Sequence, residues 1–172
     1  MIVSGIDEDE VVETDPAALV LELARRKARA VAEEVHGDAL VVGCDSVLDV
    51  DGTVHAKPSS VDEARQRLRA LRGQSAVLRT GHCVIDTASG QESTGVASTT
   101  VRFGEFSNAE LETYLATGEA LAVAGAFTLD GRSAPFVDGV DGDPSNVIGL
   151  SLPLLRRLLL DLGVSITELW TS

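Results

Sequence analysis

An acid and two lysines are the side chains most able to do chemistry in this chain. Asp45 follows the aliphatic run at 40–42, which reads as a buried strand. An unpartnered buried carboxylate is costly or has a strongly shifted pKa, so an acid at this place favours a site over an ordinary strand residue. Lys27 and Lys57 are the only lysines among 14 basic residues. A compact ammonium suits a crowded phosphate oxygen, although solvated surface lysines are the plain alternative. Lys57 follows a hairpin that returns from Asp45, so we expect both to border one cleft.

A second interpretation centres on Asp49 and Asp51. The string DVDGTV at 49–54 resembles the opening motif of the haloacid-dehalogenase-like phosphatases, in which the first Asp attacks phosphorus and the second handles the proton. The string GDPSN at 142–146 is similar to their late metal motif. That family needs strand–helix–strand crossovers after its first motif, whereas a hairpin signal and Pro58 follow here. The sequence therefore favours Asp49 and Asp51 as ordinary hairpin-turn residues over phosphatase residues.

Length and composition bound the function. With 172 residues and 44% hydrophobic side chains, the chain can form one domain or two small lobes sharing a cleft. The net charge of −13 argues against binding to nucleic acid or to an anionic membrane. A polyanionic substrate would therefore need a local basic cluster, a metal ion, or both. Cys44 and Cys83 lie in apolar runs, as expected of buried reduced thiols in a cytoplasmic protein.

Periodicity and turn signals predict an α/β protein. Antiparallel hairpins alternate with crossover helices, which predicts a mixed, curved sheet flanked by helices, with two lobes around a cleft. The expected elements are a helix from Asp15-Pro16 to His36-Gly37, a central strand that begins at 40, a return strand at 54–56, a helix opened by the capping box at 60–63, strands at 75–86 and 92–103, a helix opened by the capping box at 107–110, strands from about 122, and a closing helix at 152–162.

An ordered set of short motifs resembles the Maf family of nucleoside triphosphate pyrophosphatases. The helix segment LARRKA at 23–28 is similar to that family's LAxxKA motif, and VGCDS at 42–46 is similar to its catalytic strand. The string AKP at 56–58 resembles its GKP. The segments LRG at 71–73, TGH at 80–82, AGAF at 124–127, and GD with NVIGL at 142–150 follow in the family's order. Each motif alone is weak, but the ordered set is specific and covers nearly the whole chain.

The resemblance implies a fold, an activity and a set of roles. The family cleaves a nucleoside triphosphate between the α and β phosphates, releasing a nucleoside monophosphate and pyrophosphate, with sanitation of modified or noncanonical nucleotides as its expected purpose. By this resemblance Asp45 is the proton acceptor that activates water. Glu8 and Asp45 hold a divalent cation, Mg²⁺ or Mn²⁺. Lys27 and Lys57 neutralise phosphate oxygens, which reconciles an acidic protein with a polyanionic substrate.

The sequence departs from the family in two places. The family begins with a strand and a helix bearing SxSPRR, and this chain lacks that string, so we expect a single Maf-like domain over 1–172 that is truncated at its N-terminus. Ser46 and Asp130 stand at the base-reading positions and match neither nucleotide-specific branch of the family. We expect a cytoplasmic protein that binds a nucleoside triphosphate and no nucleic acid or membrane, and that forms a homodimer by family analogy. A nucleotide-binding module with weakened catalysis is the non-enzyme alternative.

Overall fold

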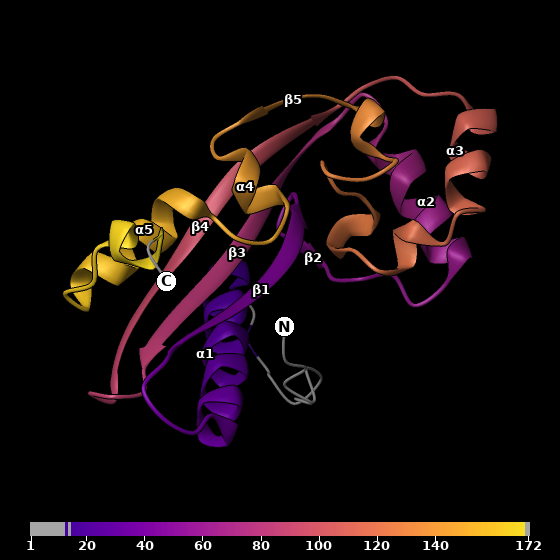
Figure 1. Cartoon of the computed structure of the whole chain (residues 1–172). Helices are drawn as coiled ribbons and strands as arrows, with labels where there is room; N and C mark the ends of the chain where they lie inside the picture. The colour runs from indigo at the N-terminus through magenta and orange to yellow at the C-terminus, as the bar shows by residue number, and fades with distance from the viewer. Residues whose placement is uncertain (1–12, 14, 171–172) are drawn as a thin grey trace. The chain divides into compact units, whose positions relative to one another are not determined.

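A computed structural model describes residue 13 and residues 15–170 (Figure 1). The chain divides into two compact units, each built from segments that are separate in the sequence. Unit 1 comprises Met1–Asp45, Thr80–Ala97 and Gly149–Ser172, and unit 2 comprises Ser46–Arg79 and Ser98–Ile148.

Five strands form one sheet in the order β2-β1-β3-β4-β5. The strands are β1 (Leu40–Val50), β2 (Thr53–His55), β3 (Ser75–Asp86), β4 (Gln91–Phe103) and β5 (Val137–Asp141). The α/β class and the hairpin between β1 and β2 are confirmed, with Asp49 opposite Val54. The sheet is antiparallel rather than mixed. A helix, α2 (Val61–Leu71), does connect β2 to β3 as predicted. These two strands are not neighbours in the sheet, because β1 lies between them, so the crossover creates no parallel pair of adjacent strands.

Unit 1 places helices on both faces of its strands. The first is α1 (Pro16–Glu34), which begins as predicted: Asp15 accepts a hydrogen bond from the Ala18 amide, and proline takes the first helical position. Its buried alanines pack with Val41, Cys83 and Ile85. The second is α5 (Leu152–Asp161), whose leucines pack against Val84. Because successive side chains of a strand point to opposite faces of the sheet, Cys83 and Ile85 face α1 while Val84 faces α5.

Two glycines let α1 lie unusually close to the sheet. A Cβ at Gly43 would lie 2.4 Å from the Ala24 carbonyl oxygen and 2.8 Å from the Ala28 Cβ. A Cβ at Gly81 would lie 2.1 Å from the Val20 carbonyl oxygen. Both obstacles are the helix itself, which cannot move aside as a flexible side chain could. Glycine at 43 and 81 therefore sets the distance between α1 and strands β1 and β3.

Unit 2 buries the other ends of the long strands under short helices. The helices α2 (Val61–Leu71) and α3 (Asn108–Leu115) lie side by side (Figure 1). The short turns η2 (Glu119–Leu121), η3 (Ala124–Ala126) and η4 (Ala134–Phe136) follow, and α4 (Pro144–Val147) comes after β5. Leu48, Leu68, Val101, Leu111 and Phe127 are all buried in one core. Unit 2 thus has a hydrophobic centre of its own.

Three local expectations need correction. The segment from 122 to 129 is not a strand, because Gly125 and Ala126 both adopt positive φ, at 68° and 69°, which breaks an extended run. Val42 is 42% exposed, so the aliphatic run at 40–42 is not uniformly buried. The capping box at 60–63 is only half formed: Ser60 caps the Glu63 amide, while the Glu63 carboxylate bonds Ser59. The box at 107–110 is complete.

No helix in the described part of the chain is long and apolar enough to cross a membrane. The last turn, η5 (Ile166–Trp170), ends the described part of the chain and leaves Trp170 74% exposed.

Replacing Gly43 by alanine should destabilise the protein by about 1–3 kcal/mol, because the new methyl group would collide with the α1 backbone. Chemical denaturation at constant pH measures the change. Gly95→Ala is the matched control, since the Cβ there would meet the flexible Leu154 side chain at 3.0 Å. Equal stability of the two variants would contradict the tight packing of α1.

Candidate active site

The Asp45 carboxylate forms an ion pair with Lys27 in unit 1. Lys27 lies in the middle of α1, and its Nζ donates to Oδ1 of Asp45 on β1. The two side chains are 22% and 10% exposed, so both charges are largely removed from water. Desolvation of either charge alone would be expensive, and each compensates the other. The close approach of α1 at Gly43 brings the ammonium within reach of the strand.

Asp45 lies inside a strand rather than at its end. The sequence predicts a buried strand at 40–42 with the acid just beyond it, but β1 spans 11 residues and continues to Val50. Val47 and Leu48 are buried at 2% and 0% exposure, and their burial extends the strand beyond the acid. A residue in mid-strand is held more rigidly than one on a loop.

The thiol beside Asp45 is held in its neutral form. Burial, with a smaller contribution from the Asp45 charge, raises the pKa of Cys44 to about 12. Burial likewise raises the pKa of Cys83 to about 11. Both cysteines are free thiols, as expected. Since a thiol rather than a thiolate is present at neutral pH, neither cysteine is activated as a nucleophile.

Lys57 belongs to unit 2, where its chain neighbour is anchored. The Ala56 carbonyl accepts hydrogen bonds from Nη1 of Arg67 and, at 3.3 Å, from the Gly125 amide. Arg67 is only 9% exposed, and burial lowers its pKa while Glu63 partly offsets that shift. Pro58 on the other side of Lys57 is buried as well. An exposed ammonium is therefore carried on a fixed backbone.

Asp130 lies at an exposed position of a closed loop in unit 2. Its Oδ1 accepts a hydrogen bond of 2.5 Å from the Thr128 hydroxyl. Thr128 and Ser133 close the base of the loop, because the Thr128 amide donates to Ser133 Oγ at 2.9 Å and Ser133 Oγ donates back to the Thr128 carbonyl at 3.1 Å. Tyr114 fixes the preceding residues through a 3.0 Å hydrogen bond from its hydroxyl to the Ala126 carbonyl.

The candidate residues thus divide between the units. Lys27 and Asp45 meet in unit 1, whereas Ser46, Lys57 and Asp130 belong to unit 2. Ser46 follows Asp45 directly on β1 and is half-buried. Glu8 lies outside the described residues.

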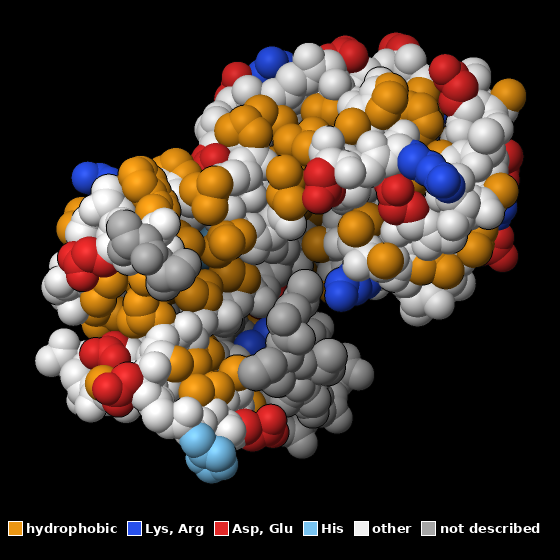
Figure 2. Space-filling model, in the orientation of Figure 1, with side chains coloured by type: hydrophobic (Ala, Val, Ile, Leu, Met, Phe, Trp, Pro, Cys, Tyr) orange, Lys and Arg blue, Asp and Glu red, His pale blue; other side chains and the backbone are white. Residues whose placement is uncertain are grey.

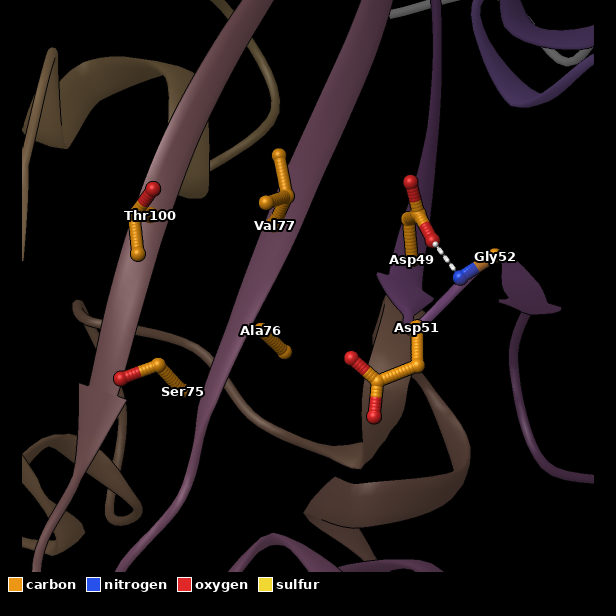
Figure 3. Close-up of a pocket in the computed structure, with 7 residues that line it drawn as sticks. All are labelled: Asp49, Asp51, Gly52, Ser75, Ala76, Val77 and Thr100. Atoms are coloured by element: carbon orange, nitrogen blue, oxygen red, sulfur yellow. Dashed lines mark hydrogen bonds between the residues drawn. The ribbon is translucent and has the colours of Figure 1, made fainter.

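Asp49 and Asp51 line a shallow pocket of about 220 Å³ in unit 2 (Figure 3). Asp49 is fully engaged: Oδ1 accepts from the Gly52 amide at 2.8 Å, and Oδ2 accepts from Nε and Nη2 of Arg79 at 3.1 and 3.0 Å. Asp51 has a positive φ of 49° in the turn. Asp51 is a turn residue, whereas Asp49 lies near the end of β1 with both carboxylate oxygens hydrogen-bonded, as suits a structural hairpin residue rather than a nucleophile.

Two structural residues were not found from the sequence. Arg67 could have been paired with Glu63 from their spacing of four on a helix. Glu119 gave no signal in the sequence. It follows the end of a helix, and the Arg132 amide that donates to it comes 13 residues later, beyond another turn.

The fold and the paired charges define an α/β domain with a largely buried acid–lysine pair on an antiparallel sheet. A family described as "Maf-like protein" matches residues 1–162, so the chain belongs to the Maf family. The chain is 62% identical over 172 residues to a protein of Streptomyces coelicolor named "Nucleoside triphosphate pyrophosphatase", covering 99% of this chain and 83% of that protein. A protein of Salinispora tropica with the same name is 50% identical over 175 residues, covering 99% and 77%.

The single tyrosine allows a direct test of how well the residues before the Asp130 loop are packed, because Tyr114 contacts Ala126 there. Burial raises the pKa of Tyr114 from 10.0 to about 12. The stability gained by keeping the phenol neutral is therefore present below pH 10 and is lost as the pH rises from 10 towards 12. Absorbance of the phenolate should show a native midpoint near pH 12 and a midpoint near 10 in urea. A native midpoint near 10, with the folded circular dichroism spectrum intact, would contradict this burial.

Proposed function

We propose that this protein hydrolyses nucleoside triphosphates between the α and β phosphates, releasing a nucleoside monophosphate and pyrophosphate. The observation that carries the proposal is the ion pair of Lys27 and Asp45, in a chain of the Maf family. Relatives of 50–62% identity that carry the name nucleoside triphosphate pyrophosphatase support the same activity.

Asp45 is the proposed general base. Its carboxylate takes a proton from water, the water oxygen bonds to the α phosphorus, and the bond from that phosphorus to the bridging oxygen breaks as pyrophosphate leaves. Lys27 holds the carboxylate in place before substrate binds. A phosphate oxygen close to the ammonium would share its charge, which would raise the proton affinity of Asp45 when the substrate is present.

Lys57 is proposed to neutralise phosphate oxygens, a role that suits an exposed ammonium on an anchored backbone. Ser46 and Asp130 are proposed to contact the base. A carboxylate only accepts hydrogen bonds, so Asp130 would favour a base edge that presents N–H groups. Neither residue matches a nucleotide-specific branch of the family.

A divalent cation, Mg²⁺ or Mn²⁺, is proposed to assist. No group of three or more His, Cys, Asp or Glu side chains in the described ranges is placed to hold a metal ion. The donor chemistry nonetheless fits, since Mg²⁺ is commonly held by one or two carboxylates together with substrate phosphates. Asp45 would supply one such oxygen and Glu8 another. The ion would neutralise charge on the phosphates.

The biological setting is proposed by family analogy. We infer a cytoplasmic enzyme that removes modified or noncanonical nucleotides.

We also propose a homodimer: hydrophobic side chains gather on the surface over α5 and η5 (Figure 2), where Leu152, Leu160, Leu169 and Trp170 are 45–74% exposed. Sedimentation equilibrium should give twice the chain mass, and a monomer at micromolar concentration would exclude this assembly.

Asp45→Asn should lower kcat by about 10²–10⁴-fold, the range typical of a lost general base, while the fold is retained. Pyrophosphate release from nucleoside triphosphates with Mg²⁺ measures it. Asp49→Asn is the matched control on the same strand: it should keep turnover and lose about 1–3 kcal/mol of stability, because it weakens the bonds to Arg79. The opposite pattern, with orthophosphate as product, would support the dehalogenase-like mechanism instead. Tight nucleotide binding without turnover in the unmutated protein would identify a binding module.

Removing divalent cations with a chelator should abolish pyrophosphate release, and added Mg²⁺ or Mn²⁺ should restore it. The circular dichroism spectrum should not change on chelation, because no described cluster of ligands is needed for folding. Full activity after chelation and dialysis would remove the cation from the mechanism.

A further inference from the structure

The carboxylate of Glu119, also in unit 2, clamps the backbone of the loop that carries Asp130. Glu119 belongs to η2, and its two carboxylate oxygens accept from the Arg132 amide at 2.9 and 3.1 Å. Its Oε1 also lies 3.4 Å from the Ser133 amide nitrogen, which donates to it. One side chain thus binds two successive backbone N–H groups just after Asp130.

A side chain at position 131 would collide with this clamp. A Cβ at Gly131 would lie 2.5 Å from Oε1 of Glu119 and 2.7 Å from Cγ2 of Thr128. Glycine between Asp130 and the clamped amides therefore leaves the space that the Glu119 carboxylate occupies. Ser133 is fully buried and Thr128 is 8% exposed, so the base of the loop is packed as well as hydrogen-bonded.

The clamp acts on Asp130 rather than on substrate. Asp130 is exposed, and its carboxylate is oriented by Thr128 at one end of the loop. Glu119 holds the other end through the amides of Arg132 and Ser133. Loss of either restraint would let the Asp130 carboxylate sample several positions, and a hydrogen-bonding group that is not held contributes little discrimination.

We propose that Glu119 is a positioning residue that sets base selectivity by fixing Asp130. The inference rests on the proposed function, since it assumes that Asp130 contacts the base of a nucleoside triphosphate. Removing the clamp should weaken the preference among bases and raise KM, while kcat stays nearly unchanged, because Asp45 and Lys27 belong to unit 1.

The test compares Glu119→Ala and Glu119→Gln with the unmutated full chain. Glu110→Gln is the matched control, since Glu110 is also a carboxylate of unit 2 that accepts a backbone amide, from Ser107 at 2.7 Å, but at the start of α3. Hydrogen–deuterium exchange of the segment 127–136 reports the clamp without any need for activity. Ratios of kcat/KM among ATP, GTP, CTP and UTP, and ratios of Kd for their non-hydrolysable α,β-methylene analogues, report selectivity.

We expect faster exchange of 127–136 and about a tenfold loss of base preference in Glu119→Ala, with kcat within about threefold of the parent. Glu119→Gln should have exchange rates and base preference between those of the parent and Glu119→Ala, because its amide keeps one acceptor oxygen. Glu110→Gln should lower stability without changing base preference. Unchanged exchange, or faster exchange with unchanged selectivity, would overturn the inference. A parent protein that binds the analogues without hydrolysing them would refute the proposed activity and still test the clamp, whereas a parent that binds none would refute both.

Discussion

The pairing of one ammonium with one largely desolvated carboxylate is the constraint on which the candidate site depends. Asp45 can remain charged inside a strand because Lys27 lies against it. Lys27 reaches it because α1 packs directly on β1, and that contact requires Gly43. A largely buried pair of this kind adds little net stability, so its presence is better explained by chemistry than by folding.

The two units supply different properties. Unit 1 is layered, with helices on both faces of its strands, and such a frame restricts the geometry of the acid and its partner. Unit 2 holds its exposed polar groups through backbone clamps: Arg67 fixes the residue before Lys57, while Glu119 and Ser133 fix the loop of Asp130. In each case a less exposed side chain bonds the main chain and leaves the neighbouring charged group available to solvent.

Local signals in the sequence predicted much of this fold. Capping residues at Asp15 and Ser107 and the turn at Asp51 gave element boundaries correct to within a few residues. The antiparallel pairing of the whole sheet could not be predicted, because it depends on β1 lying between β2 and β3. No local signal in the sequence specifies that strand order. The order of the motifs predicted the family. The partnership of Lys27 with Asp45 and the clamp by Glu119 join residues distant in the sequence, and no periodicity records such contacts.

The most direct test of the central claim is to follow oxygen from labelled water into the products. If water activated by Asp45 attacks the α phosphorus, hydrolysis of a nucleoside triphosphate in H₂¹⁸O will place the label in the nucleoside monophosphate and leave pyrophosphate unlabelled, as read by mass spectrometry. Label in pyrophosphate, or release of labelled orthophosphate with a nucleoside diphosphate, would contradict the account.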